Sequence, residues 1–291
     1  MKYFEGFYVK CAGKNDDLAV IFGRQTCDSD RSSFIQIITK DKSYGATYQN
    51  QPSTFSYKPF KTMVGDSFCD EAGLVLDINT HDLNAKGFVS FSDFTPIKYD
   101  AMGPLKLLPK MECKHTVISM QHKIEGKIAL NGQIYDFSKG TGYIEGDRGK
   151  SFPSEYFWSQ ASDKKSGACL FASAAKIPYL GFSFMGTICI ANFEGKEHRF
   201  ASYLGAKVKQ INDKKLLIRQ GKKTLEIEVL DDKQGLDLKA PNLGQMSRVI
   251  KESLDRKVKY KMAVGDNTLF EFSTDRGAVE YSCLENKNIQ Q

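Results

Sequence analysis

Residues 119–145, SMQHKIEGKIALNGQIYDFSKGTGYIE, decide the fold, because the chain repeats their pattern at residues 253–280, SLDRKVKYKMAVGDNTLFEFSTDRGAVE. The two stretches align from first residue to last, with one extra turn residue in the second copy, so that Glu145 corresponds to Glu280. A repeat with so long a period is typical of a duplicated structural unit.

The beginnings of the two halves also correspond. Residues 7–24, FYVKCAGKNDDLAVIFGR, resemble residues 157–174, FWSQASDKKSGACLFASA, with an aromatic pair, a charged turn and an apolar run in each. We therefore predict two tandem domains, residues 1–146 and 147–291. Each is long enough for a barrel or curved sandwich of about eight strands.

Short alternating runs separated by turn signals predict strands throughout. Asn131-Gly132 between two such runs is typical of a β-hairpin, and residues 215–229 predict another hairpin around GKK. Residues 244–258, GQMSRVIKESLDRKV, are the best helix candidate, but the repeat, which begins at residue 253, favours a strand. The sequence predicts an all-β protein of antiparallel hairpins.

Composition limits the class of function. Hydrophobic residues make up 41% and charged residues 26% of the 291 residues, which indicates a globular chain. The net charge of +6 is small, and many lysines stand beside acids in turns. We expect no nucleic-acid partner, because basic residues would then gather on one face. At most, we expect peripheral contact with a membrane surface.

The cysteines and the N-terminus point to a cytoplasmic protein. The seven cysteines show no CxxC spacing and several lie in apolar runs, which is typical of buried thiols. The start, MKYFEGFYVK, lacks the apolar segment of a signal peptide. We expect no metal site, since the four histidines form no metal-binding motif, and no nucleotide or flavin fingerprint is present.

Residues 142–161, GYIEGDRGKSFPSEYFWSQA, are the main candidate site. If residues 143–147 are extended, then Tyr143, Glu145 and Asp147 share one face. Two carboxylates close together in a cavity would not both ionise, so the pKa of one would rise and it could act as a general acid. Arg148 could oppose this by pairing with one of them. The alternative is a salt-bridged surface turn.

Two further acids are candidates. Glu5 lies among aromatic residues in the first strand, where it is either a buried acid or a charge that protects a sheet edge. Glu112 and His115 are separated by an odd number of residues, so on a regular strand they would face opposite ways.

These motifs resemble the tocopherol cyclase family. YFEGFYVK at residues 3–10 is similar to that family's F-E-G-W-Y-x-K opening. MECKH at residues 111–115 and GYIEGDRGKSFP at residues 142–153 are similar to its M-E-C-x-H, G-Y-I-E-x-D-W-G and S-F-P blocks. The family is distantly similar to carotenoid hydratase-type and lipocalin-like proteins, which implies two lipocalin-like antiparallel β-barrel or sandwich domains.

The resemblance implies cofactor-free closure of a ring by protonation of a prenyl double bond. It implies Glu145 or Asp147 as the acid, with Glu5 and His115 as alternates. Tyr8, Tyr156 and Trp158 would line the apolar cavity, where aromatic faces stabilise a carbocation.

Two departures from the family pattern favour a different substrate or reaction. Phe7 stands where the family has Trp in its opening motif, and Arg148 replaces the Trp of D-W-G.

Two functions therefore compete. The first is a cofactor-free cyclase or hydratase of an isoprenoid or prenylated lipid. The second is a non-catalytic carrier of a hydrophobic small molecule, with Arg148 binding an anionic head group. An enzyme requires a carboxylate with a raised pKa facing the cavity. A carrier requires carboxylates paired with Arg148 or Lys150 at its rim.

Overall fold

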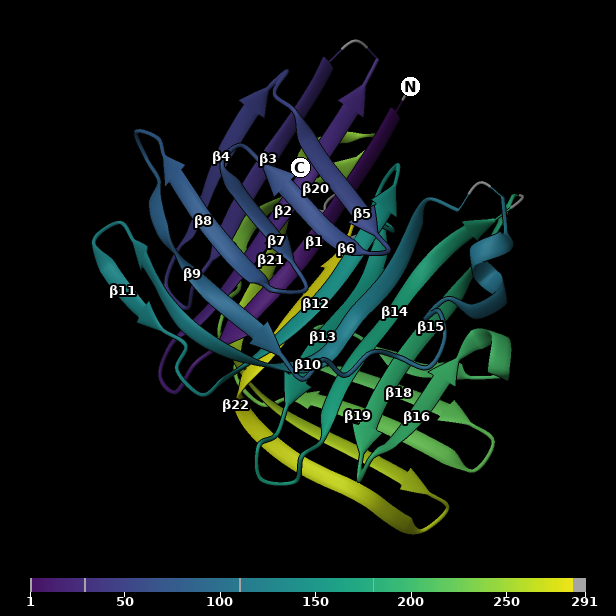
Figure 1. Ribbon diagram of the computed structural model, residues 1–291. Helices are drawn as coiled ribbons and strands as arrows, with labels where there is room; N and C mark the ends of the chain where they lie inside the picture. The colour runs from purple at the N-terminus through teal and green to yellow at the C-terminus, as the bar shows by residue number, and fades with distance from the viewer. Residues whose placement is uncertain (1, 29, 110, 180, 285–291) are drawn as a thin grey trace. The chain divides into compact units, whose positions relative to one another are not determined.

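The computed structural model describes residues 2–28, 30–109, 111–179 and 181–284. These residues form β-strands joined by turns, with two short 3-10 helices and no α-helix among them (Figure 1). The all-β prediction is confirmed. None of the described helices is long and apolar enough to cross a membrane.

The first sheet contains twelve strands and the first half of the chain supplies all of them. Its strands are β1 (Lys2–Ala12), β2 (Asp17–Cys27), β3 (Asp30–Ile38), β4 (Ser43–Gln49), β5 (Ser53–Tyr57), β6 (Phe60–Val64), β7 (Ser67–Asp70), β8 (Gly73–Asn79), β9 (Asn84–Ser92), β10 (Cys113–Leu130), β11 (Gln133–Asp136) and β12 (Gly140–Gly149). Their spatial order is β4-β3-β2-β1-β12-β10-β9-β8-β7-β6-β5, and β11 pairs with β10. The first strand therefore lies beside the last, and β5 is an edge strand.

The second sheet contains ten strands from the second half. Its strands are β13 (Glu155–Ser162), β14 (Cys169–Tyr179), β15 (Phe182–Phe193), β16 (Lys196–Ala201), β17 (Lys207–Ile211), β18 (Lys215–Gln220), β19 (Lys223–Val229), β20 (Leu236–Asn242), β21 (Gln245–Val264) and β22 (Asn267–Cys283). Their order is β16-β15-β14-β13-β22-β21-β19-β18-β17, with β20 paired to β21. The first strand of this half again lies beside the last. Strand β21 also settles the helix candidate as a strand.

Local sequence accounts for the hairpins. Asn131 and Gly132 turn β10 into β11 with positive φ angles of 47° and 85°, a geometry that Asn-Gly adopts readily. In the hairpin β18–β19, alternation buries Leu225 and Ile227. Its other face carries Glu226 and Glu228, and both pair with Lys215.

Strand register supports the repeat at the junction of first and last strands. Phe7 on β1 pairs with Gly146 on β12, and Phe157 on β13 pairs with Tyr281 on β22. The sequence aligns Phe7 with Phe157, and its later alignment places Gly146 with Tyr281. Two separate alignments thus meet in one pairing.

The hairpin after the central strand repeats in the same way. Lys127 pairs with Asp136 in the first sheet, and the aligned Lys261 pairs with Glu271 in the second. Both pairs are also ion pairs, with N–O distances of 3.0 and 3.3 Å. The register and the strand order thus repeat from one sheet to the other, and the predicted pair of antiparallel β-sheets is confirmed.

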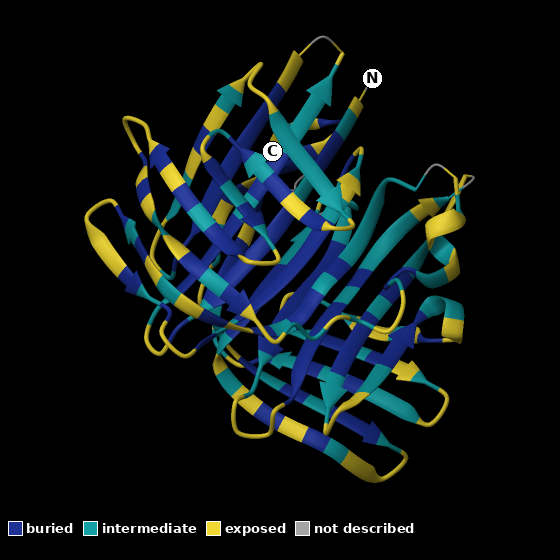
Figure 2. Ribbon diagram, in the orientation of Figure 1, coloured by how far each residue is buried: buried dark blue, intermediate teal, exposed yellow. Residues whose placement is uncertain are grey.

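Each sheet curls around its own apolar core, and the buried residues gather on the central strands while the hairpin turns are exposed (Figure 2). In the first sheet Phe7, Val9 and Ile144 belong to the core. In the second, Phe157 and Val279 do so. We call the side facing this core the core face of each sheet, and the opposite side its outer face.

The chain divides into two compact units, and each unit is made of three separate stretches of sequence. Unit 1 comprises Met1–Ile97, His115–Ser151 and Leu238–Arg248, and unit 2 comprises Lys98–Lys114, Phe152–Asp237 and Val249–Gln291. Strand β12 continues to Gly149. The domain boundary at 146/147 stays a prediction and falls within this strand.

Candidate functional site

Strand β12 presents its acids on the outer face of unit 1. Ile144 belongs to the core, so Tyr143, Glu145 and Asp147 point to the opposite side. This confirms that the three side chains share one face. Glu145 is nevertheless buried, with 5% of its surface exposed.

Tyr143 donates a short hydrogen bond to Glu145. The distance from the phenolic oxygen to Glu145 Oε2 is 2.5 Å. Burial raises the pKa of Tyr143 well above its usual value, and the neighbouring charge of Glu145 raises it further. The phenol therefore remains a donor at neutral pH, and its bond stabilises the ionised form of Glu145.

His115, on the neighbouring strand β10, lies between the two carboxylates. Its Nδ1 is 3.0 Å from Asp147 Oδ1, and its Nε2 is 3.5 Å from Glu145 Oε2. An ionised carboxylate only accepts hydrogen bonds, so an ionised Asp147 would place the hydrogen of His115 on Nδ1. Nε2 is then the nitrogen that faces Glu145. We call His115, Tyr143, Glu145 and Asp147 the acid cluster.

The acid cluster can hold and move one proton. With Nδ1–H directed at Asp147, a second proton taken up by the cluster would bind either Glu145 or His115 Nε2. Moving it between them exchanges a neutral acid and imidazole for an ion pair, which is the arrangement needed for general acid and base steps. One donor atom from each of His115, Glu145 and Asp147 also lies within 4.8 Å of the others, so the three could together bind a cation.

Arg148 does not belong to the acid cluster. As the next residue after Asp147, it points to the core face, where its guanidinium carbon lies 4.7 Å from the centre of the Tyr57 ring. The expected pairing of Arg148 with Glu145 or Asp147 is therefore wrong, because adjacent residues of a strand face opposite ways.

Glu5 also points to the core face, and Arg24 neutralises it. Nε and Nη2 of Arg24 donate to Glu5 Oε2 at 2.9 and 2.5 Å. Glu5 is thus buried and ion-paired, and strand alternation separates it from Glu145. If Glu5 were the general acid in place of Glu145, the reaction would need a second site on the core face.

Tyr8 lies beside the acid cluster. It pairs with Glu145 across β1 and β12, and its ring packs edge-on to Tyr143 with centroids 6.5 Å apart. The role of Tyr8 in lining a ligand cavity stays a prediction.

The remaining predicted site residues lie in unit 2. Tyr156 on β13 donates to Glu280, and Trp158 pairs with Glu280 in the strand register. Glu112 precedes β10, and burial raises its pKa. Tyr156 and Glu280 thus form a second glutamate–phenol pair within unit 2.

The residues of the acid cluster lie in a part of the sequence that matches a known protein family. Residues 78–282 match the family described as tocopherol cyclase-like, and this range contains His115, Glu145 and Asp147. The chain belongs to this family. No functionally curated sequence shows significant similarity to it.

Two crystal structures share the fold of this tocopherol cyclase-like chain. A protein of Nitrosomonas europaea, provisionally assigned as AttH, is 12% identical, with a TM-score of 0.56 over 97% of this chain and 92% of that one. Kievitone hydratase from Nectria haematococca is 11% identical, with a TM-score of 0.56 over 98% and 90%. At these identities the likeness concerns the fold.

Sequence reasoning missed three residues of the tocopherol cyclase-like chain that the structure makes prominent. The spacing of Tyr143 from Glu145 is the sequence signal for the first of them, because residues two apart on a strand share a face. Arg24 follows from the β1–β2 hairpin, since its register sets Arg24 opposite Glu5. Tyr57 on β5 gave no signal, because it reaches the site only through tertiary packing.

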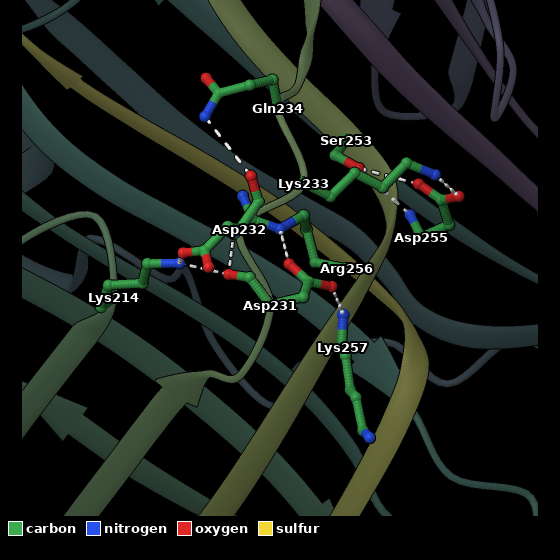
Figure 3. A network of polar contacts seen from close by, with 9 residues as sticks. All are labelled: Lys214, Asp231, Asp232, Lys233, Gln234, Ser253, Asp255, Arg256 and Lys257. Carbon is green, nitrogen blue, oxygen red and sulfur yellow. Dashed lines mark hydrogen bonds and ion pairs between the residues drawn. The ribbon is translucent and has the colours of Figure 1, made fainter.

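A polar pocket in unit 2 of this family member is a weaker candidate. It has a volume of about 230 Å³, and Lys214, Asp232 and Arg256 are among its lining residues. Figure 3 shows that its cations are paired, Lys214 with Asp232 and Arg256 with Asp231. The volume is below the range of about 300–1,000 Å³ typical of ligand pockets. We interpret the pocket as a network that joins the loop before β20 to β21.

Proposed function

We propose that the chain catalyses an acid-initiated addition to a carbon–carbon double bond of an isoprenoid or prenylated lipid, by cyclisation or hydration and without a cofactor. The observation that carries this proposal is the acid cluster, in which a phenol and an imidazole approach the same oxygen of buried Glu145. Membership in the tocopherol cyclase-like family supports the same class of reaction, as does the fold shared with a hydratase.

In the first step Glu145 protonates the alkene. The π electron pair forms the new C–H bond, which leaves a tertiary carbocation on the substrate and a carboxylate on Glu145. Tyr143 already donates to Oε2, so its hydrogen bond strengthens as the negative charge develops. Tyr8, beside Tyr143, offers an aromatic ring that attracts a cation.

In the second step an oxygen nucleophile captures the carbocation. The nucleophile is a hydroxyl of the substrate in cyclisation and a water molecule in hydration. It forms the C–O bond and loses its proton to His115 Nε2, while Asp147 stabilises the imidazolium through Nδ1–H. Transfer of this proton from Nε2 to Glu145, whose Oε2 is 3.5 Å away, restores the starting state.

The position of Arg148 removes one objection to this chemistry. A guanidinium beside a carbocation would destabilise it, and the sequence places Arg148 next to Asp147. Strand alternation directs the guanidinium to the core face, onto the ring of Tyr57. Arg148 also does not pair with Glu145 or Asp147, so the carrier requirement of carboxylates paired with Arg148 is not met.

Isotope labelling tests the reaction. The protein is incubated with a prenylated hydroquinone and with a free isoprenoid alcohol, in D₂O and separately in H₂¹⁸O, and the products are analysed by mass spectrometry. Both reactions place one solvent deuteron on carbon. Only hydration adds ¹⁸O, so the two labels together distinguish a hydratase from a cyclase.

Variants locate the acid. Glu145→Gln should give no labelled product, while Glu125→Gln, on the exposed part of β10, should behave as the wild type. Unaltered lipid recovered in equal amounts with the wild type and Glu145→Gln would identify a carrier. Normal turnover by a folded Glu145→Gln variant would overturn the assignment of the acid.

A further inference from the structure

Three charged residues form a row across the core face of unit 1. Glu5 on β1 pairs with Arg24 on β2 and, on its other side, with Arg148 on β12. All three side chains lie on the same face as Phe7, because Glu5 and Phe7 are two residues apart on one strand. We call Arg24, Glu5 and Arg148 the arginine row.

Two aromatic rings of the edge strand β5 lie against this row. The guanidinium of Arg24 is 5.0 Å from the ring centre of Phe55, and that of Arg148 is 4.7 Å from the ring centre of Tyr57. Both rings pack on Phe7, at centroid distances of 6.3 and 4.6 Å. Stacking of this kind holds a guanidinium flat and leaves its N–H edges open to a ligand.

The arginine row carries one positive charge that no carboxylate of the row compensates. Arg24 donates both of its bonds to Glu5, so that pair is neutral. Arg148 is exposed, and its side chain makes no hydrogen bond or ion pair within the part of the chain that the structure describes. The nearest carboxylate in sequence, Asp147, lies on the outer face with His115.

A second group beside Arg148 also lacks a partner. The Tyr57 hydroxyl is buried and has no hydrogen-bond partner among the described residues. A buried polar group in this state costs free energy, and in a native protein it calls for an explanation. The Tyr57 ring fits here because Gly146 has no side chain, since a Cβ there would lie 3.1 Å from the ring.

We propose that the arginine row and the β5 rings form a binding site for an organic monocarboxylate with a flat or apolar body. The carboxylate takes the fork of Arg148, with the Tyr57 hydroxyl as a further donor, and the body lies on the rings of Phe55 and Tyr57. This site is on the opposite face of β12 from the acid cluster. It therefore goes beyond the proposed reaction and does not depend on it.

Charge selects a monocarboxylate over a phosphate. The row has one uncompensated positive charge, which a single carboxylate neutralises. A phosphate group near −2 would leave one negative charge beside buried Glu5, and like charges at short range repel. The planar fork of a guanidinium also matches a carboxylate in two parallel hydrogen bonds.

Equilibrium dialysis of the full chain with radiolabelled benzoate tests the site. We expect Arg148→Gln to weaken binding by about tenfold, as loss of a charged two-point contact would. Lys150→Gln removes the same charge two residues further on and should change the dissociation constant by less than about twofold. Tyr57→Phe should weaken binding by about threefold, a neutral hydrogen bond's worth. Arg148→Lys, which retains the charge but not the fork, should fall between wild type and Arg148→Gln.

Several outcomes would overturn the proposal. These are no binding by the wild type, equal weakening in Arg148→Gln and Lys150→Gln, equal binding of benzyl alcohol, or displacement of benzoate by an equal concentration of inorganic phosphate. Glu145→Gln separates this site from the reaction. It should bind benzoate as the wild type does, and loss of binding there alone would move benzoate to the acid cluster.

Discussion

The outer faces of the two units share a motif but not a chemistry. Unit 1 buries Glu145 with a bond from Tyr143, and unit 2 buries the aligned Glu280 with a bond from Tyr156. The phenol comes from the same strand in unit 1 and from the neighbouring strand β13 in unit 2. Because both halves contain it, the buried glutamate–phenol pair belongs to the fold itself.

The imidazole makes the difference. Continuing the sequence alignment places Val249 opposite His115 and Ser282 opposite Asp147. Unit 2 thus has Val249 at the position of the imidazole, and its Glu280 lies opposite a second buried carboxylate, Glu252, across β21 and β22. The reaction proposed for unit 1 therefore depends on His115 and Asp147, which unit 1 adds to the shared glutamate–phenol pair.

The largest expected effect is a difference in kcat between variants of the two glutamates. Glu145→Gln should lower kcat by about 10²–10⁴-fold, the usual contribution of a general acid, while Glu280→Gln should leave kcat within about twofold. Each should cost about 1–3 kcal/mol of unfolding free energy, because each loses a charged hydrogen bond. Kinetics and urea unfolding of both variants measure this. Equal loss of kcat in the two would show that unit 2 takes part in the chemistry.

Two aligned glycines allow the packing of the two core faces to be compared. Gly142 and Gly277 are aligned, and a Cβ at Gly142 would lie 2.1 Å from Nε2 of His122, whereas at Gly277 it would lie 2.7 Å from a methyl group of Val258. The His122 ring cannot yield easily, because it is stacked on Phe94 at 4.7 Å. Gly142→Ala should therefore cost about 3 kcal/mol and Gly277→Ala about 1 kcal/mol.

Urea unfolding of the two alanine variants decides this comparison, with each measured against the wild type at pH 7. Equal destabilisation would mean that the rigidity of the His122 environment does not distinguish the two cores.

Acid should weaken the fold through His122. Burial lowers the pKa of His122 to about 3, whereas a histidine in an unfolded chain titrates near 6.5. Below pH 6.5 the unfolded chain binds a proton that the folded chain does not, so stability falls with pH. We expect a loss of about 2 kcal/mol between pH 7 and pH 5.

His122→Leu provides the control for this slope, because the variant has no imidazole to protonate. It should lose clearly less stability between pH 7 and pH 5 than the wild type in urea unfolding. The aligned residue in unit 2, Arg256, is ion-paired with Asp231. An unchanged slope in His122→Leu would assign the acid sensitivity to other groups.

The smallest expected effect concerns metal. His115, Glu145 and Asp147 could hold a cation, but the proposed proton transfers need none. Dialysis against a chelator, followed by assay and thermal unfolding, should change neither turnover nor melting temperature. A loss restored by adding back one divalent cation would replace the proton relay with a metal centre, and unit 2 would lack it.

Much of the fold can be predicted from the sequence alone. Asn131-Gly132 predicted its hairpin because the turn geometry depends on those two residues alone. Alternation predicts that Tyr143 and Glu145 share one face of β12, and the same rule puts Arg148 on the other face. The position of the β5 rings, Phe55 and Tyr57, could not be predicted from the sequence. Strand β5 comes into contact with Phe7 only because the sheet curls.

The sequence by itself determined the strands, their alternation and the duplication, because a strand's two faces and its turns follow from neighbouring residues. Tertiary structure decided which strands are neighbours. Only the order β1-β12-β10 sets His115 between Glu145 and Asp147. Only the pairing of β1 with both β2 and β12 lines Glu5 up with Arg24 and Arg148. Such pairings join residues far apart in the chain, and the packing of the whole sheet around its core fixes them.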